Sequence, residues 1–351
     1  MLSQVSLVFY ELTHSPGAKA LNASEKNILF VFPGQGSQYK GIGSDIYEEY
    51  ATARRIYDLA SSVLGYDIAE LSFHDPEDQI NLTRFTQPVL LTHSIACLEV
   101  FRELTEGSLK PAMAAGHSLG EYSALVAAQA LSFDSALRLV QKRGELMGRH
   151  GEGEMSAFPL DVDSIRPIAE RNHCAIAGCN LPEQTVIGGR AEDLALAEQE
   201  AQEKFERARP TRLKTEGAFH TYYMVKAAQH YREVLGAAEF SPSEVRVLSN
   251  FSGGVHATDP VDIRAGLFFQ LFHPVLWHSN LQTAFNDGID RVIEFGGGIG
   301  PASDPDGKRP NLQGMIKRVL RASGQKAHYQ AVINSRSLNE TVDYILHSGR
   351  D

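Results

Sequence analysis

The sequence predicts an α/β fold: a mostly parallel sheet with helices on both faces, plus a smaller inserted lobe. Short apolar runs alternate with longer amphipathic segments over most of the 351 residues, which is the pattern of βα units around a buried parallel sheet. Residues 152–216 instead follow the order strand, helix, strand, strand, helix, strand, which is typical of a ferredoxin-like unit. We therefore expect an N-terminal extension over 1–27, a large α/β lobe from 28–151 and 217–351, and a small lobe over 152–216.

Two strands of the large lobe are predicted by apolar runs that end at turns. Asn27–Phe32 is rich in β-forming residues and stops at Pro33-Gly-Gln-Gly, while Pro111–Gly116 is short, apolar and followed by a small-residue helix to about Ala130. The other expected elements are strands at Val5–Tyr10, Val245–Ser249 and Arg291–Phe295, helices over Asp45–Leu64, Gln87–Thr105 and Phe133–Met147, the last capped by Ser132, and helices from Tyr222 and around Ala265–Leu271.

Composition excludes several classes of protein. Hydrophobic residues make up 43% of the chain and charged residues 22%, which is ordinary for a globular protein. The net charge of -10 argues against partners such as nucleic acid or an anionic membrane, and we find no window of about 20 apolar residues. The three cysteines and 13 histidines match no metal motif and no disulfide framework. We expect a cytoplasmic protein with no metal and no cofactor.

The strongest chemical signal is Gly116-His-Ser-Leu-Gly120, a G-x-S-x-G motif between a predicted strand and a predicted helix. In that context the sharp turn exposes the serine hydroxyl, and the glycines let the backbone segments approach closely. The N–H of Leu119 would lie at a helix N-terminus, where it can stabilise an oxyanion. A backbone N–H from the loop after Phe32 could complete that oxyanion hole. The motif predicts Ser118 as a nucleophile.

A serine nucleophile needs a base, and the residues alone leave its identity open. His220 lies between a predicted strand end and a helix, a placement that suits catalysis. His117 is a weaker rival because adjacent side chains on a sharp turn point apart. Arg143 falls at or beside the apolar face of its helix, where an unpaired charge is costly. It either snorkels to solvent or pairs with an internal carboxylate, or it is left to bind the carboxylate of a substrate.

Five segments then occur in a recognisable order. They are Phe32–Gln38 (FPGQGSQ), Gly116–Tyr122 (GHSLGEY), Gln141–Met147 (QKRGELM), Ala218–His220 (AFH) and Gln270–Trp277 (QLFHPVLW). Together they resemble malonyl-CoA:acyl-carrier-protein transacylases, including the acyltransferases of polyketide synthases. The resemblance spans roughly Ile28 to Phe295 and implies an α/β-hydrolase-like large lobe with a ferredoxin-like insert.

The resemblance also implies a site and a reaction. Ser118 would take the malonyl group from coenzyme A as an ester and pass it to an acyl carrier protein, with His220 as the base. Coenzyme A thioester is then a substrate and not a cofactor. Arg143 would bind the malonyl carboxylate, and Gln35 and Leu119 would supply the oxyanion N–H groups. The remaining expected substrate-binding residues are Gln270, Asn180, Phe219 and Met147.

The resemblance leaves the acyl group, the carrier and the pathway open, with fatty-acid and polyketide synthesis as the two choices. A Gly296-Gly-Gly turn replaces the family's usual Gly-Pro-Gly, and Ser303–Asn311 reads as a polar insertion. The insertion and the N-terminal extension favour a discrete polyketide-type enzyme. We expect the carrier to dock on one of two basic clusters: Arg207, Arg209, Arg212 and Lys214, or Lys308, Arg309, Lys317, Arg318 and Arg321.

Two other functions compete with this interpretation. A serine hydrolase or thioesterase of α/β-hydrolase type would place its histidine near the C-terminus, where His347 is available. A carrier-binding scaffold with a dead site is a third reading. The complete set of Ser118, His220 and Arg143 argues against the scaffold, and a carboxylate-binding arginine favours malonyl transfer over hydrolysis.

Overall fold

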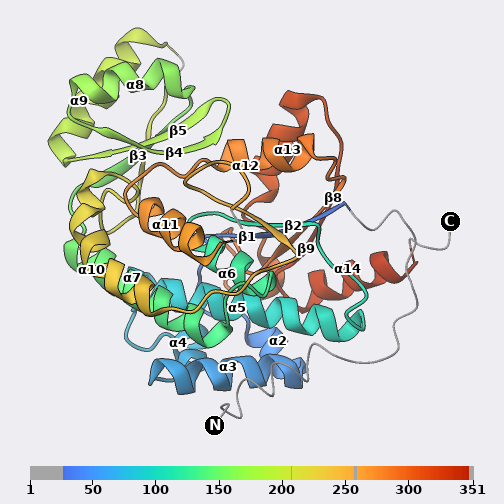
Figure 1. Cartoon of the computed structure of the whole chain (residues 1–351). Helices are drawn as coiled ribbons and strands as arrows, with labels where there is room; N and C mark the ends of the chain where they lie inside the picture. Colours follow the sequence, from blue (N-terminus) through green and yellow to red (C-terminus); the bar gives the residue numbers. More distant parts are fainter. Residues whose placement is uncertain (1–26, 207, 257–258, 348–351) are drawn as a thin grey trace.

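A computed structural model describes residues 27–206, 208–256 and 259–347, and it contains two sheets (Figure 1). The larger sheet has the strand order β7-β2-β1-β8-β9, and every pair in it is parallel. Its strands are β1 (Ile28–Phe32), β2 (Met113–Gly116), β7 (Arg246–Leu248), β8 (Arg291–Phe295) and β9 (His328–Val332). The predicted α/β fold class is confirmed. The strand expected at Val5–Tyr10 lies outside the described residues.

The central strand β1 divides the interior into two cores. Ile28, Phe30 and Phe32 point into one core and Leu29 and Val31 into the other, as the period of two along a strand requires. The first core is covered by α2 (Ser44–Glu49), α3 (Ala51–Leu64), α4 (Ile68–Phe73), α5 (Thr83–Leu104), α6 (Gly120–Ala127), α7 (Phe133–His150), α10 (Val225–Ala237), α11 (Pro260–Gln270) and α14 (Ser335–His347). The second core is covered by α12 (Trp277–Asn286) and α13 (Gln313–Ser323).

The strand register brings the carboxyl ends of β1 and β2 to the same edge of the large sheet. Phe32 at the end of β1 lies opposite Gly116 at the end of β2. Because the strands are parallel, the loops that follow them emerge at the same edge, where ligands bind in open α/β sheets. The predicted nucleophile, Ser118, lies in the second of these loops.

The smaller sheet forms from the six elements expected for the small lobe. These are β3 (Glu154–Phe158), α8 (Val162–Arg171), β4 (Ala175–Leu181), β5 (Gln184–Gly189), α9 (Ala191–Lys204) and β6 (Thr211–Leu213), with the antiparallel strand order β4-β5-β3-β6. Strand β4 joins the rest of the protein at Val275, whose N–H donates to Ala177 O at 3.0 Å and whose carbonyl accepts from Cys179 N at 2.8 Å. The small sheet is thereby held beside the start of α12.

The helix predicted over Asp45–Leu64 is two helices, because Tyr50 has an extended backbone that ends α2 and precedes α3. The Tyr50 hydroxyl donates to Asn339 at 3.2 Å. This contact joins residues far apart in the sequence, so the local sequence pattern could not predict it.

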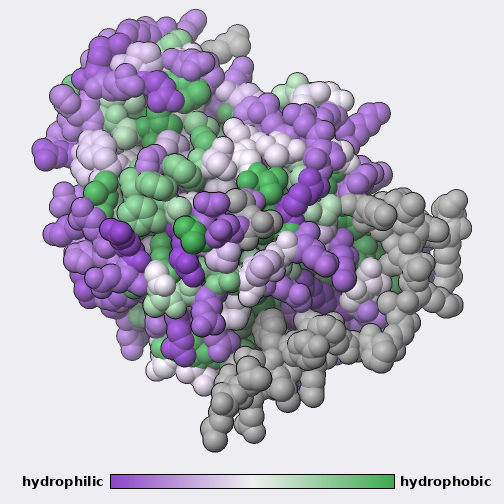
Figure 2. Space-filling model, viewed as in Figure 1, coloured by the Kyte–Doolittle hydropathy of each residue, from purple (hydrophilic) through white to green (hydrophobic). Residues whose placement is uncertain are grey.

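Polar residues cover most of the face in Figure 2, with apolar patches around α11. Within the described ranges, no helix is long and apolar enough to cross a membrane.

Candidate active site

Ser118 lies on a sharp turn between β2 and α6 with a φ of 52°, in the left-handed region that is strained for a side chain. The turn is possible because glycines flank it. A Cβ on Gly116 would lie 1.8 Å from the carbonyl carbon of Gly120, so strand and helix pack with backbone against backbone. Ser118 is half-buried, and the turn presents its hydroxyl at the carboxyl edge of the sheet.

The loop after β1 runs directly against this turn. A Cβ on Gly34 would lie 2.4 Å from the carbonyl oxygen of His117, and Gln35 follows at once. Among the described residues, the backbone N–H groups of Gln35 and Leu119 have no hydrogen-bond acceptor. Two N–H groups in adjoining loops beside a serine hydroxyl are the arrangement that an oxyanion hole needs.

His220 is brought to Ser118 across 102 residues of chain, with 2.7 Å between its Nε2 and the Ser118 Oγ. On the other side of the ring, Nδ1 lies 2.7 Å from the carbonyl oxygen of Gln270. A carbonyl only accepts, so Nδ1 carries the proton and Nε2 is left to accept from the serine. The orienting group is a backbone carbonyl and not a carboxylate.

His220 is neutral in this environment. Burial lowers its pKa from 6.5 to about 3, and the positive charge of Arg143 adds to the effect. Both causes disfavour the imidazolium form. The residue also has a φ of 61°, so both members of the pair have left-handed backbones. Such strain is found where the surrounding structure fixes a site.

Arg143 is a buried cation, 1% exposed, on the face of α7 that packs toward the serine. Its Nη2 donates to Gln270 Oε1 at 2.9 Å and lies 3.3 Å from Ser118 Oγ. Its guanidinium carbon lies 5.7 Å from the centre of the Tyr122 ring. In the described part of the chain no carboxylate forms an ion pair with it, and its Nε has no partner. Among the described residues, Arg143 therefore neither snorkels to solvent nor pairs with an internal carboxylate.

Sequence reasoning missed three residues behind the serine: Glu121, Asn250 and His256. Glu121 is fully buried and accepts from Asn250 N at 3.0 Å and from His256 Nε2 at 2.5 Å. The Asn250 side chain accepts from Ser118 N at 2.6 Å and donates to Gly116 O at 2.7 Å. One signal was available, because Glu121 is an acid in a helix whose other residues are small or apolar.

The remaining predicted residues lie around this centre. Asn180, on β4, accepts a hydrogen bond through its Oδ1 from the His117 Nε2 at 2.9 Å. This contact links the small sheet to the residue next to Ser118. Phe219 precedes His220 and is 5% exposed. Met147 lies one turn beyond Arg143 and is 3.4 Å from Gln87 Nε2.

His347, the base expected for a hydrolase, is not brought to the serine. It is exposed at the end of α14, and its Nδ1 lies 2.7 Å from the carbonyl oxygen of Asp343 in the same helix. Among the described residues, no three side chains of histidine, cysteine, aspartate or glutamate form a group that could hold a metal ion.

A serine on a strand-to-helix turn, bonded to a histidine at the carboxyl edge of a parallel sheet, defines the class of serine-dependent acyl-transfer proteins. A family model for the acyl transferase domain matches residues 29–294. The malonyl CoA-acyl carrier protein transacylase of Bacillus subtilis is 38% identical over 304 residues, which cover 84% of this chain and 90% of the relative. The chain belongs to the acyl transferase family.

Solved structures of similar proteins agree with this assignment. The malonyl CoA-acyl carrier protein transacylase of Coxiella burnetii has a TM-score of 0.82 at 31% identity, covering 92% of this chain and 99% of that one. A malonyl-transacylase solved in complex with its type II polyketide-synthase acyl-carrier protein has a TM-score of 0.79 at 32% identity. The superposition covers 91% of this chain and 99% of that one.

Proposed function

We propose that this protein is a malonyl-CoA:acyl-carrier-protein transacylase, which moves a malonyl group from coenzyme A to the phosphopantetheine thiol of a carrier protein. One observation carries the choice of acyl group: Arg143 is a buried cation without a carboxylate partner in the described chain, 3.3 Å from the Ser118 hydroxyl. A malonyl thioester has a free carboxylate three carbons from CoA sulfur, which a guanidinium can bind bidentately. The names of the similar transacylases agree with that substrate.

In the first half-reaction Ser118 Oγ attacks the thioester carbonyl and His220 Nε2 accepts its proton. The negative charge that develops on the carbonyl oxygen is stabilised by the N–H groups of Gln35 and Leu119. When the tetrahedral intermediate collapses, the C–S bond breaks, and the proton on His220 passes to the coenzyme A sulfur. A malonyl ester remains on Ser118. In the second half-reaction His220 takes the proton of the carrier thiol, the thiolate attacks the ester, and Ser118 recovers its proton.

Substrate binding is expected to strengthen the base. In the free enzyme, the charge of Arg143 is one cause of the lowered pKa of His220. A malonyl carboxylate bound to Arg143 neutralises that charge, so the pKa of His220 rises when the substrate is in place. The imidazolium that forms during attack is then less costly. Malonyl-CoA would thus be favoured over acetyl-CoA in the chemical step as well as in binding.

The carrier is proposed to dock near Lys308 and Arg309. Lys308 lies in the segment after β8, and its Nζ is 4.4 Å from the ring centre of Tyr39, in the loop after β1. That is the catalytic edge of the sheet. Lys317 instead lines a groove with the first residues of β8 and β9, at the opposite edge. In the other expected cluster, Arg207 lies outside the described residues and Arg212 is bound by Glu154 and Glu198.

We further propose the domain division expected above, with 28–151 and 217–351 as the large lobe and 152–216 as the small lobe. The contact of Asn180 with His117 supports a substrate cleft between the two. The three cysteines of the chain are unpaired, which supports a cytoplasmic location because disulfides form in oxidising compartments. The carrier belongs to fatty-acid or polyketide synthesis, and the KM for the two kinds of carrier would separate them.

Time-resolved mass spectrometry of the enzyme mixed with malonyl-CoA, with and without holo carrier protein, tests the proposal. A transacylase accumulates one malonyl group per chain and loses it to the carrier when the carrier is added. A thioesterase releases free malonate at the same rate with or without carrier. A carrier-binding scaffold gains no mass. Either of the last two results would contradict the proposal.

A further inference from the structure

Behind the serine lies a buried polar cluster that the reaction as described does not use. Its centre is Glu121, on the first turn of α6, with an exposed fraction of 0%. Each carboxylate oxygen has a donor: His256 Nε2 on Oε1, and both Asn250 N and Gln270 Nε2 on Oε2. Among the described residues no Lys or Arg pairs with this carboxylate, so its three hydrogen bonds are what offset the cost of burying it.

The Gln270 side chain links this carboxylate to the cation that faces the substrate. Its Nε2 donates to Glu121 Oε2 at 2.8 Å and to Ser118 O at 2.9 Å, and its Oε1 accepts from Arg143 at 2.9 Å. A carboxylate can only accept and a guanidinium can only donate, so the amide has one permitted orientation. Glu121 therefore fixes which end of Gln270 meets Arg143.

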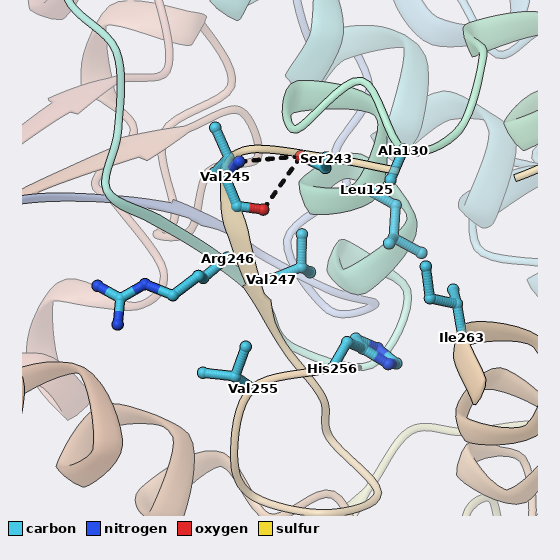
Figure 3. Close-up of a pocket in the computed structure, with 9 residues that line it drawn as sticks. All are labelled: Leu125, Ala130, Ser243, Val245, Arg246, Val247, Val255, His256 and Ile263. Atoms are coloured by element: carbon cyan, nitrogen blue, oxygen red, sulfur yellow. Dashed lines mark hydrogen bonds between the residues drawn. The ribbon is translucent and has the colours of Figure 1, made fainter. Parts of the chain in front are cut away.

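We infer that Glu121 is the positioning residue of the site: through Gln270 it holds Arg143 in place for the malonyl carboxylate, and through Asn250 it holds the Ser118 turn. His256 contributes to this positioning because its Nε2 donates to the other carboxylate oxygen, Glu121 Oε1. Figure 3 shows His256 in the wall of a small cavity beside β7, with Val247 and Ile263. The cavity has a volume of about 40 Å³, so the ring adjoins space and is not packed on every side.

Glu121→Gln is the sharpest perturbation because it keeps the shape and removes the charge. One amide oxygen cannot serve three donors, and the new NH₂ group faces either His256 or the pair of Asn250 and Gln270. The Gln270 amide can then adopt either of its two orientations. Arg143 is consequently no longer held in one position. We expect the preference for malonyl-CoA over acetyl-CoA, as a ratio of kcat/KM values, to fall by about 10- to 100-fold.

The matched control is Glu99→Gln, which removes a buried carboxylate on α5 that pairs with Arg102 at 2.7 Å, away from the site. It should leave the preference unchanged. In a Gln270→Ala background, Glu121→Gln should lower the preference no further, because its route to Arg143 is already gone. The inference would be overturned if Glu121→Gln lowered the malonyl preference equally in the wild-type and Gln270→Ala backgrounds. It would also be overturned if Glu121→Gln alone left the preference unchanged.

A second variant covers the case in which Glu121→Gln does not fold. His256→Ala removes one of the three donors to the carboxylate and enlarges the cavity next to it, and it should lower the preference in the same direction by a smaller factor. An unchanged preference in folded His256→Ala would also count against the inference. The inference rests on the proposed function. If the wild-type enzyme transfers no malonyl group, the proposed function is refuted. If the wild type and the variants all keep the preference for malonyl-CoA, only the role of Glu121 is refuted.

Discussion

Replacing Arg143 with alanine should remove the preference for malonyl-CoA while leaving acyl transfer itself possible. The guanidinium is 1% exposed and its polar contacts are with uncharged groups, Gln270 and Ser118. A substrate carboxylate would supply the missing countercharge. The nucleophile and its base, 2.7 Å apart, are held by bonds that do not involve the arginine.

The magnitude follows from the burial of the pair. A hydrogen-bonded ion pair removed from water typically costs about 2–5 kcal/mol when one partner is truncated. Arg143→Ala should therefore lower kcat/KM for malonyl-CoA by roughly 30- to 5,000-fold, at about 1.4 kcal/mol per decade. Acetyl-CoA has no carboxylate, so its use should fall little or rise. Arg143→Lys should rescue malonyl transfer only in part, because an ammonium cannot form the two parallel bonds of a guanidinium.

Single-turnover acylation of the purified enzyme by each thioester gives both rates in one assay. Arg138→Ala is the matched control, because Arg138 is exposed on the same helix. Circular dichroism checks that each variant is folded. An equal loss of activity toward both thioesters in folded Arg143→Ala would refute the reasoning and make the arginine structural.

Three further predictions test other parts of the site. Arg143→Ala should raise the pKa of His220, so the acidic limb of the kcat/KM profile moves to higher pH; a limb that stays in place contradicts the electrostatic argument. Malonyl-CoA should outcompete methylmalonyl-CoA on the wild-type enzyme, because we expect the ring of Phe219 to fill the space that a branch would need; the reverse order would disprove this. Lys308→Glu should raise the KM for the carrier by about fivefold while Lys317→Glu leaves it unchanged, and equal effects would remove the proposed docking site.

Residues that belong to a local motif were predictable from the sequence. Ser118 lies in a motif whose spacing dictates the turn, and Arg143 stands out as a charge on an apolar helix face. The same argument would have found Glu121, an acid in the otherwise small and apolar helix α6. Asn250 and His256 could not be found in this way. They meet Glu121 across 129 and 135 residues, and each looks like an ordinary loop residue.

The secondary-structure elements also divide into those that a local pattern predicts and those that it does not. The buried strands β1 and β2 are short apolar runs and were predicted, whereas β9 was not. It is an edge strand with its first residue exposed and only its last two buried, so His328–Val332 has no apolar run. Helices α12, α13 and α14 were also missed. Each is amphipathic and short, so its stability depends on tertiary packing: α12 and α13 pack on β4, and α14 packs on α5 and α2 as well as on the preceding strand β9.

The central claim is that the acyl group passes through an ester on Ser118. The most direct measurement is peptide mapping of enzyme quenched in acid after a brief reaction with malonyl-CoA, in wild type and Ser118→Ala. The account predicts one malonyl group, located on the peptide that contains Ser118, and none on the folded alanine variant. Malonyl found on another residue, or a Ser118→Ala variant that still loads carrier protein at the wild-type rate, would contradict it.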